Sequence, residues 1–281
     1  MGTSEADSPT DGGDATARWS RRNNVATTSS IMLFPIGDDD RRLTGTPYVT
    51  GSIVLALFAV FALGQRWGEA ADFTLAFAAV PYELTTWQDL VGPVETTLAG
   101  EPVVTEHQPG PVPLTAITAL LLHSGLIHLG GNAFFLWIFG NNVELHLGRL
   151  RFAGLFLLSG LTGIAIHVVA EPASTVPLIG ASGSVAGVLG AYGVLFPRNR
   201  VYVLFLFRVI TIPAVLAVGL WGALQVAGGL GTWYLNGPGT GAAVVSFTAH
   251  VGGLLTGVLV GGVARWRGRT GRARRWGRAT G

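Results

Sequence analysis

Residues 177–194 read Pro-Leu-Ile-Gly-Ala-Ser-Gly-Ser-Val-Ala-Gly-Val-Leu-Gly-Ala-Tyr-Gly-Val, and the rest of the chain is best understood around them. The stretch is apolar, yet it opens with a Gly-Ala-Ser-Gly segment whose serine is Ser182. Gly183, Gly187 and Gly190 then recur at helical spacing, which lets the backbone of another helix come very close. One interpretation is a helix-packing face with Ser182 as the N-cap of the helix. Residues elsewhere in the chain favour a second interpretation, in which Ser182 does chemistry.

The composition is that of a protein embedded in a membrane. Only 12% of the 281 residues are charged, and 49% are apolar. Several apolar runs approach or exceed the roughly 18 residues that mark a transmembrane helix. We therefore expect an all-α, polytopic membrane protein built as one bundle. The chain has no Cys, which removes disulfides, thiol nucleophiles and thiolate metal sites together.

The local amino-acid composition divides the chain into three regions. Residues 1–31 are rich in Ser, Thr, Asp and Gly and are expected to form a disordered cytoplasmic tail. Residues 32–265 are expected to form the membrane domain, and residues 266–281 an Arg-rich cytoplasmic tail. Met32, where the apolar texture begins, is a second possible start beside Met1.

Six transmembrane helices are expected within the membrane domain. The apolar runs place them at residues 49–64, 126–143, 151–170, a short one from Ser182 to Pro197, 209–228 and 246–264. Residues 201–207 form a lead-in that can belong to the fifth helix. Long loops are expected at 65–113, whose apolar middle at 73–84 suits the membrane interface, and at 229–245.

The arginines predict the orientation of this bundle. No Lys occurs, and the basic residues cluster at alternate connections and in the C-terminal tail. The clusters lie at Arg41 and Arg42, Arg149 and Arg151, Arg198 and Arg200, and from Arg265 onward, whereas the other three loops hold only Arg66. By the positive-inside rule both termini lie in the cytoplasm, and the acidic loop at 65–113 lies outside.

This topology places several polar side chains at one depth. Ser182 is 16 residues from Arg198, and His250 is 15 residues from Arg265. At ~1.5 Å per residue the two side chains lie about 24 and 22 Å from the cytoplasmic boundary, inside a hydrocarbon core ~30 Å thick. His128 and Asn132 lie at the same outer end, on the second helix. Polar groups at that depth tend to line a water-filled cavity.

A serine beside a histidine at a helix N-terminus is a nucleophile with its base. The free backbone N–H groups and the positive dipole of the helix end suit an oxyanion, and His128 and Asn132 could add donors. Taken alone, His250 is equally compatible with a polar packing residue, and Asn132 with an interhelical hydrogen bond. The glycines Gly253 and Gly257 of the last helix, packed on Gly183 and Gly187, would bring Ser182 and His250 together. Ser184 should face away from His250, and Glu144 is expected to pair with an interfacial Arg.

These motifs resemble those of the rhomboid intramembrane serine proteases. The matching residues are His123-x4-His128-x3-Asn132, Gly180-Ala-Ser182-Gly183 and Ala249-His250-x2-Gly253-x3-Gly257, within a resemblance that covers about residues 32–265. The resemblance implies Ser182 as nucleophile, His250 as general base and acid, and His128, Asn132 and the Ser182 amide as oxyanion stabilisers. It also implies a Ser-His dyad without a carboxylate, in agreement with the absence of an acid from the fourth and sixth apolar helices.

The function that the resemblance implies is cleavage of peptide bonds in or near transmembrane segments through an acyl-enzyme, with no metal and no cofactor. The expected partners are transmembrane protein substrates and membrane lipid, not nucleic acid, with the oligomeric state open. The expected location is the cell membrane, with the site opening toward the outside. Two alternatives remain: a catalytically inactive relative that binds or escorts membrane proteins, and a transporter, for which the chain offers no buried carboxylate and no evident repeat.

Overall fold

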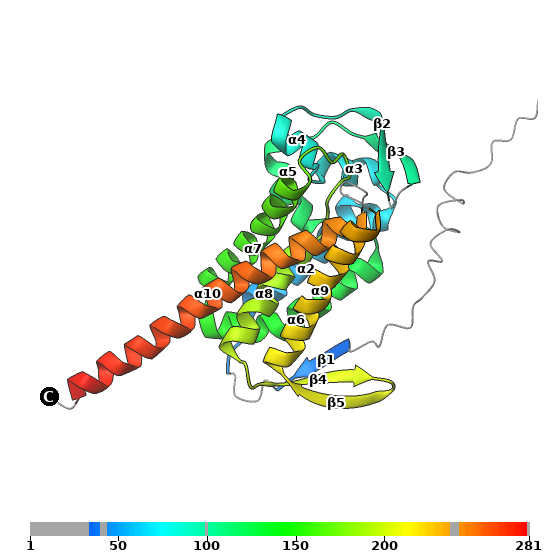
Figure 1. Ribbon diagram of the computed structural model, residues 1–281. Helices are drawn as coiled ribbons and strands as arrows, with labels where there is room; N and C mark the ends of the chain where they lie inside the picture. Colours follow the sequence, from blue (N-terminus) through cyan, green and yellow to red (C-terminus); the bar gives the residue numbers. More distant parts are fainter. Residues whose placement is uncertain (1–33, 40–43, 99–100, 237–241, 280–281) are drawn as a thin grey trace, which may run out of the picture.

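The structure, a computed structural model, describes residues 34–39, 44–98, 101–236 and 242–279, and it is mostly helical. The predicted tail at 1–31 and the start at Met32 lie outside these residues. Figure 1 shows a bundle of long helices with a small β structure at each end. In chain order the elements are β1 (Phe34–Asp38), α2 (Tyr48–Ala59), η1 (Val60–Gly64), η2 (Arg66–Gly68), α3 (Ala71–Phe77), α4 (Pro81–Thr86), β2 (Gly92–Leu98), β3 (Glu101–His107), α5 (Val112–Thr118), η3 (Ala119–Leu121), α6 (Leu126–Leu147), α7 (Arg149–Ala170), α8 (Ser182–Leu195), β4 (Arg200–Phe205), β5 (Arg208–Pro213), α9 (Ala214–Asn236) and α10 (Ala242–Ala279).

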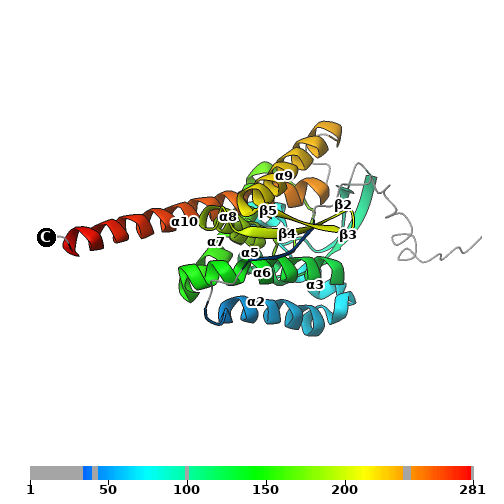
Figure 2. The ribbon, with the colours of Figure 1, turned by 90° about the horizontal axis from the view of Figure 1, so that it is seen from below.

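The helix α8 forms the centre of the bundle. Its residues from Gly183 to Gly193 are all buried, which suits a segment that is apolar on every face. It packs mainly against α10, α7 and α6, and α9 adds a smaller contact. Figure 2 shows α8 enclosed among these helices, with α2 on the far side of α6. The segment quoted first from the sequence is thus the one that the other helices surround.

Glycine contacts bring α8 and α10 together. A Cβ added to Gly253 would lie 1.9 Å from the carbonyl oxygen of Gly183, and one added to Gly257 would lie 1.8 Å from that of Gly187. Real Cβ atoms do not approach an oxygen so closely, so only glycine permits this separation of the two backbones. The Ser159 hydroxyl of α7 lies against the same Gly187, so α7 and α10 both approach α8 at this glycine.

Glu144 on α6 holds the start of α2. Its carboxylate accepts hydrogen bonds from the backbone N–H of Val49 at 2.9 Å and of Thr50 at 2.7 Å, and from the Thr50 hydroxyl at 2.8 Å. The expected pairing of Glu144 with an arginine is therefore wrong. A buried carboxylate is instead satisfied by the unpaired N–H groups and the positive dipole at a helix N-terminus.

Two of the expected segment types are also wrong. Residues 201–207 are not a helical lead-in, because β4 and β5 pair as an antiparallel hairpin and β1 pairs with β4 to complete a three-stranded sheet. The Gly-rich segment at 229–245 is not a long loop, because α9 continues to Asn236 and α10 begins at Ala242. The fifth helix accordingly starts at Ala214, five residues later than expected, and the sixth continues past Arg265 to Ala279.

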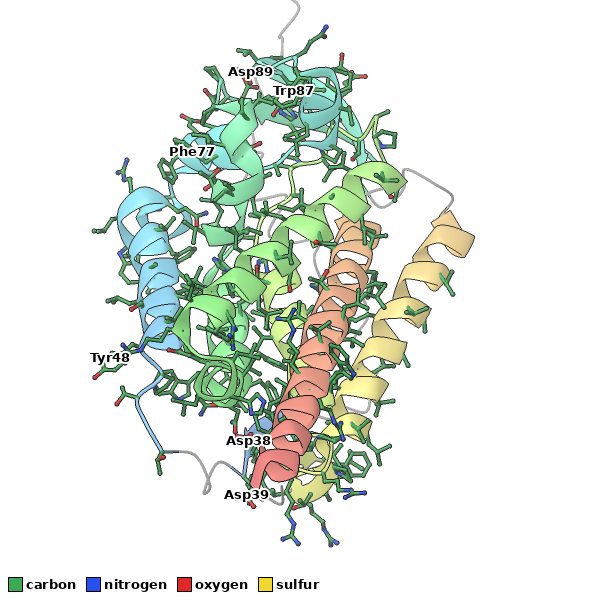
Figure 3. All side chains as sticks on the ribbon, turned by 90° about the vertical axis from the view of Figure 1, so that its left-hand side faces the viewer. Asp38, Asp39, Tyr48, Phe77, Trp87 and Asp89 are labelled. Atoms are coloured by element: carbon green, nitrogen blue, oxygen red, sulfur yellow. The ribbon has the colours of Figure 1, made fainter. Side chains whose placement is uncertain are left out.

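The β structures mark the two ends of the bundle. Figure 3 shows Asp38, the last residue of β1, and the adjacent Asp39 at the end opposite Trp87 and Asp89. At the first end, Asp38 Oδ2 accepts hydrogen bonds from the Tyr192 hydroxyl of α8 at 2.5 Å and from Asn142 Nδ2 of α6 at 2.9 Å. The three-stranded sheet is thereby fixed to the bundle.

A hairpin and short helices occupy the other end. The region expected as a loop at 65–113 contains α3, α4 and the β2–β3 hairpin. Glu83 and His107 are buried there with Oε1 and Nδ1 3.9 Å apart. Burial raises the pKa of the Glu83 carboxyl and lowers the pKa of the His107 imidazole, so that each favours its neutral form.

The lengths of the helices bear on the number of membrane spans. Within the described residues, α7 and the segment Phe247–Gly268 of α10 are long and apolar enough to cross a membrane. A third span is possible if α5 and η3 are combined with α6, from which they are bent by 77°. Three further apolar helices, Tyr48–Gly64, Ser182–Leu195 and Ala214–Gly228, lie at the other expected positions but are shorter, so the number of six spans stays a prediction.

Candidate active site

A cavity of about 560 Å³ opens where the N-terminus of α8 meets α6, α9 and α10. Its walls include His128 and Asn132 of α6, Ser182 and Gly183 of α8, and His250 of α10. The other predicted glycines, Gly187, Gly253 and Gly257, lie in the helix contact below the cavity and do not line it. The structure therefore brings the four predicted polar residues to one place from three helices.

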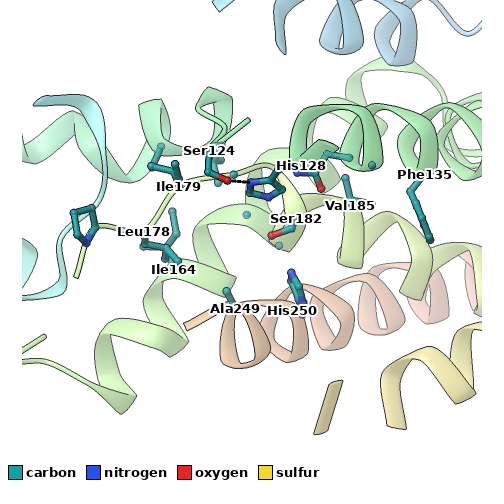
Figure 4. A pocket seen from close by; sticks show the side chains of 18 of the residues that line it. Ser124, His128, Phe135, Ile164, Leu178, Ile179, Ser182, Val185, Ala249 and His250 are labelled. Atoms are coloured by element: carbon teal, nitrogen blue, oxygen red, sulfur yellow. Dashed lines mark hydrogen bonds between the residues drawn. The ribbon is translucent and has the colours of Figure 1, made fainter. Parts of the chain in front are cut away.

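Ser182 is the first residue of α8. The N-cap is Ala181, and no side chain caps the helix, so the interpretation of Ser182 as N-cap does not hold. The first N–H groups of a helix have no partner within it, and the end of α8 faces the cavity. Figure 4 shows the Ser182 side chain between the rings of His128 and His250. A hydroxyl, two imidazoles and a helix N-terminus thus share one space.

Short backbone pairings hold the loop that leads to Ser182. Leu178 exchanges hydrogen bonds with Ala79, N–H to O at 2.7 and 3.0 Å, and the Gly180 N–H donates to the Ala119 carbonyl at 2.8 Å. Gly180 has φ +121°, which disfavours any other residue. A Cβ at this position would also come 2.8 Å from His128 Cε1. The glycine before Ala181 therefore lets the loop turn directly beside the His128 ring.

Two donors from α6 lie against the same glycine. His128 Nδ1 is 3.1 Å from the Ser124 hydroxyl, and its ring lies edge-on to His123 with centroids 5.1 Å apart. The amide nitrogen of Asn132 is 3.9 Å from the position of a Gly180 Cβ. That nitrogen is buried and has no hydrogen-bond partner among the described residues. It is therefore an unpaired donor at the cavity wall. An asparagine that served to make an interhelical hydrogen bond would have this nitrogen paired.

His250 makes two contacts with α9. Its Nδ1 is 2.7 Å from Gln225 Oε1, and its ring lies 5.7 Å from the Trp221 ring, with the planes 39° apart. Its Nε2 is buried and has no hydrogen-bond partner within the part of the chain that the structure describes. Neither of these α9 residues is among those predicted from the sequence. A glutamine inside an apolar helix, one turn after a tryptophan, was the signal that could have found them.

Ser184 takes no part in the cavity. Its hydroxyl lies against Gly160 of α7, where a Cβ on that glycine would meet it. Its buried oxygen therefore points toward α7 and not into the cavity, as its angular separation from Ser182 predicts. It offers a serine of the same helix with which Ser182 can be compared.

A helical bundle with a serine and a histidine facing one cavity is the arrangement expected of a rhomboid-type membrane protein, and similarity to known proteins indicates the same class. The Rhomboid domain family model matches residues 113–267, more than half of the chain, and the chain belongs to the rhomboid family. The family expected from the motifs is thus confirmed. Members of this family are integral membrane proteins.

Named relatives come from mitochondria and from bacteria. The chain is 32% identical to Rhomboid protein 1, mitochondrial, of Saccharomyces cerevisiae over 152 residues. This matched region is 53% of this chain and 41% of that protein. The chain is 33% identical to RHOMBOID-like protein 6, mitochondrial, of Arabidopsis thaliana, covering 52% of this chain and 41% of that one. It is 38% identical to Rhomboid protease GluP of Bacillus subtilis, covering 30% and 16%. The chain thus spans less than half the length of each.

Proposed function

We propose that the chain is an intramembrane serine endopeptidase that cleaves peptide bonds in or near transmembrane segments of other proteins. The observation that carries the proposal is the cavity that Ser182 and His250 share, with His250 Nε2 buried and unpartnered among the described residues. A neutral imidazole nitrogen with a free lone pair can accept the proton of a serine hydroxyl. The relative named Rhomboid protease GluP supports the same reaction class.

The reaction divides into two acyl transfers. Ser182 Oγ attacks the carbonyl carbon of the peptide bond, and its proton passes to His250 Nε2. As the tetrahedral intermediate collapses, the C–N bond breaks and His250 gives the proton to the leaving nitrogen. Water then attacks the ester in the same way, with His250 as base, which releases the acid and restores the serine. No metal or cofactor is needed for either half.

The oxyanion is stabilised by groups that already face it. We assign the Ser182 backbone N–H, Asn132 Nδ2 and His128 Nε2 to this task. When the Ser124 hydroxyl donates to His128 Nδ1, the proton of the neutral ring resides on Nε2, the atom that lies near Gly180. Donors fixed before the reaction stabilise the developing charge in a low-dielectric cavity without reorganisation.

The proposed topology has six spans with both termini in the cytoplasm of a cell membrane and the cavity opening outward. The support is the alternation of arginines. Arg149 and Arg151 lie in the first turn of α7, Arg198 follows α8 and Arg200 begins β4, at the end of the bundle that carries β1, β4 and β5. The cavity lies toward the other end, beside the loop that pairs with Ala79.

The test of the function compares two serines of one helix. Purified wild type should cleave a transmembrane peptide in liposomes and bind a fluorophosphonate probe covalently. Ser182→Ala should abolish both, His250→Ala should abolish cleavage, and Ser184→Ala should leave cleavage within about twofold because its hydroxyl lies against α7. Thermal unfolding shows that each variant is folded. Full cleavage by Ser182→Ala, or a wild type that neither cleaves nor reacts with the probe, would refute the proposal in favour of an inactive relative.

A further inference from the structure

Nδ1 of His250, the ring nitrogen that does not act as the base, has a defined hydrogen-bond partner. Nδ1 lies 2.7 Å from Gln225 Oε1, a distance at the short end of the range for an N–H···O hydrogen bond. A carbonyl oxygen can only accept, so the pairing places the proton of the neutral ring on Nδ1. The same pairing leaves Nε2 as the lone-pair nitrogen, and Nε2 is the buried ring atom without a partner among the described residues.

We propose that Gln225 is the positioning residue that holds His250 in the tautomer and orientation needed for it to act as base, so that the dyad is completed by a neutral amide from α9. This inference rests on the proposed function of Ser182 and His250. It follows the physical role of the third residue in hydrolases with three-membered sites, where a group on the far nitrogen of the histidine fixes its tautomer.

The chemistry of the cavity favours an amide in this role. None of the described residues that line the cavity is an aspartate or a glutamate. A carboxylate would have to be desolvated in a largely apolar site, at a cost of several kcal/mol unless well paired, whereas an amide carries no charge. The amide fixes the proton on Nδ1 but adds no negative charge to stabilise an imidazolium.

Trp221 restricts the ring further. It lies one helical turn before Gln225 on the same face of α9 and lines the cavity beside His250. With centroids 5.7 Å apart and planes inclined by 39°, the indole limits rotation of the imidazole about its Cβ–Cγ bond. Gln225 therefore sets which nitrogen faces Ser182, and Trp221 helps to keep it there.

The experiment separates an acceptor from a space-filling side chain. Gln225→Met keeps the length and approximate volume of the side chain but removes the carbonyl acceptor, whereas Gln225→Glu keeps an acceptor. We expect Gln225→Met to lower kcat by about 10- to 100-fold, part of the roughly 10²–10⁴-fold that a general base contributes, with KM within about twofold. Gln225→Glu should recover part of that loss. Val226→Ala, at an exposed position on the same helix, should leave kcat unchanged.

A second readout does not depend on activity. Imidazole ¹⁵N chemical shifts of His250, assigned with the His250→Ala variant, report which nitrogen carries the proton. Wild type should show Nδ1 protonated, and Gln225→Met should shift the population toward Nε2–H. If Gln225→Met fails to fold, Gln225→Ala gives the same comparison with a residue that favours helix.

The outcomes are distinguishable from failure of the proposed function. A wild type that does not cleave would sink the protease assignment, while the ¹⁵N shifts would still test the role of Gln225. A Gln225→Met variant with the wild-type kcat in an active protease, or with the wild-type tautomer, would overturn the inference. Loss of kcat together with the change of tautomer, and recovery by Gln225→Glu, would support it.

Discussion

Asn132 shows how much one side chain can decide at the scale of the residue. From the sequence, an asparagine inside an apolar helix suits either an interhelical hydrogen bond or an oxyanion donor. The structure leaves its amide nitrogen buried beside Gly180 with no partner among the described residues. A buried donor without a partner costs about 1–3 kcal/mol. Such a cost is expected where the partner arrives with the substrate, which favours the second interpretation.

The first prediction at this scale follows from the unpaired amide nitrogen of Asn132. Asn132→Ala should lower kcat by about 10²–10³, equivalent to about 2.7–4 kcal/mol, because one oxyanion donor is lost. KM should change little, since the donor acts on charge that develops in the transition state. Covalent reaction with a fluorophosphonate should persist slowly because Ser182 and His250 remain.

The control for Asn132→Ala is stability. Because the amide nitrogen has no partner in the resting structure among the described residues, its removal should not lower the unfolding midpoint. Steady-state cleavage of a transmembrane peptide in liposomes, measured beside thermal unfolding, decides the question. Wild-type kcat, or a loss of activity explained by unfolding, would return Asn132 to a packing role.

At the scale of the element, the contact between α8 and α10 positions the site. Ser182 and His250 lie on different helices, and their separation is set by the glycines that follow them, Gly183 and Gly187 on α8 and Gly253 and Gly257 on α10. The sequence predicts this pairing from the spacing of the glycines alone. The sequence does not give how closely the two helix backbones approach: Cβ atoms added at Gly253 and Gly257 would come within 2 Å of carbonyl oxygens of α8.

Two glycines of α10 provide a matched test of that contact. Gly257→Ala should destabilise the protein by about 1–3 kcal/mol or more, because the new Cβ would lie 1.8 Å from the Gly187 carbonyl oxygen and the helices must separate. Gly262→Ala adds the same methyl group where nothing lies within 4 Å, and it should be neutral or slightly stabilising. Apparent thermal unfolding midpoints and kcat measure both. Equal midpoints for the two variants would show that α10 is not held by this contact.

The elements also show where sequence reasoning stops. The helices α6, α7 and α8 are found within a few residues because long apolar runs and arginine boundaries define them. The strands β4 and β5 are missed because Val-Tyr-Val-Leu-Phe at 201–205 is a continuous apolar run, which periodicity cannot distinguish from a helix. Their turn is equally hidden, since Leu206 and Phe207 adopt φ of +45° and +66° where Gly or Asn would have been the signal.

The candidate site is subject to the same limit. Motif spacing is enough to select Ser182, His250, His128 and Asn132, because each belongs to a short motif that can be read directly from the sequence. Gln225 is not selected, since its register against His250 depends on where α9 begins, and the sequence placed that start five residues too early. A contact between side chains of two helices requires both positions, and only the motif-bearing helices were well placed.

At the scale of the whole molecule, the question is how the bundle lies in the membrane. The two β structures are at opposite ends, and the arginines at 149, 151, 198 and 200 adjoin the end with the three-stranded sheet. Asp89 and the β2–β3 hairpin mark the other end. The cavity lies toward that end, beside the loop that pairs with Ala79. Orientation therefore decides from which side of the membrane a substrate bond and water reach Ser182.

Topology reporters fused after chosen residues test the orientation and the number of spans together. Fusions after residues 90 and 173, which lie in two segments at the end of the bundle nearer the cavity, should report the outside. Fusions after residues 148 and 206 should report the cytoplasm, because loops rich in arginine are retained there. Replacing Arg149 and Arg151 with Glu should weaken the cytoplasmic signal at residue 148, whereas the same change at Arg66 should not. Opposite signals after residues 90 and 173 would show that an odd number of spans separates them, and the six-helix topology would be wrong. An outside signal at both 148 and 206 would instead invert the bundle and place the cavity on the cytoplasmic side.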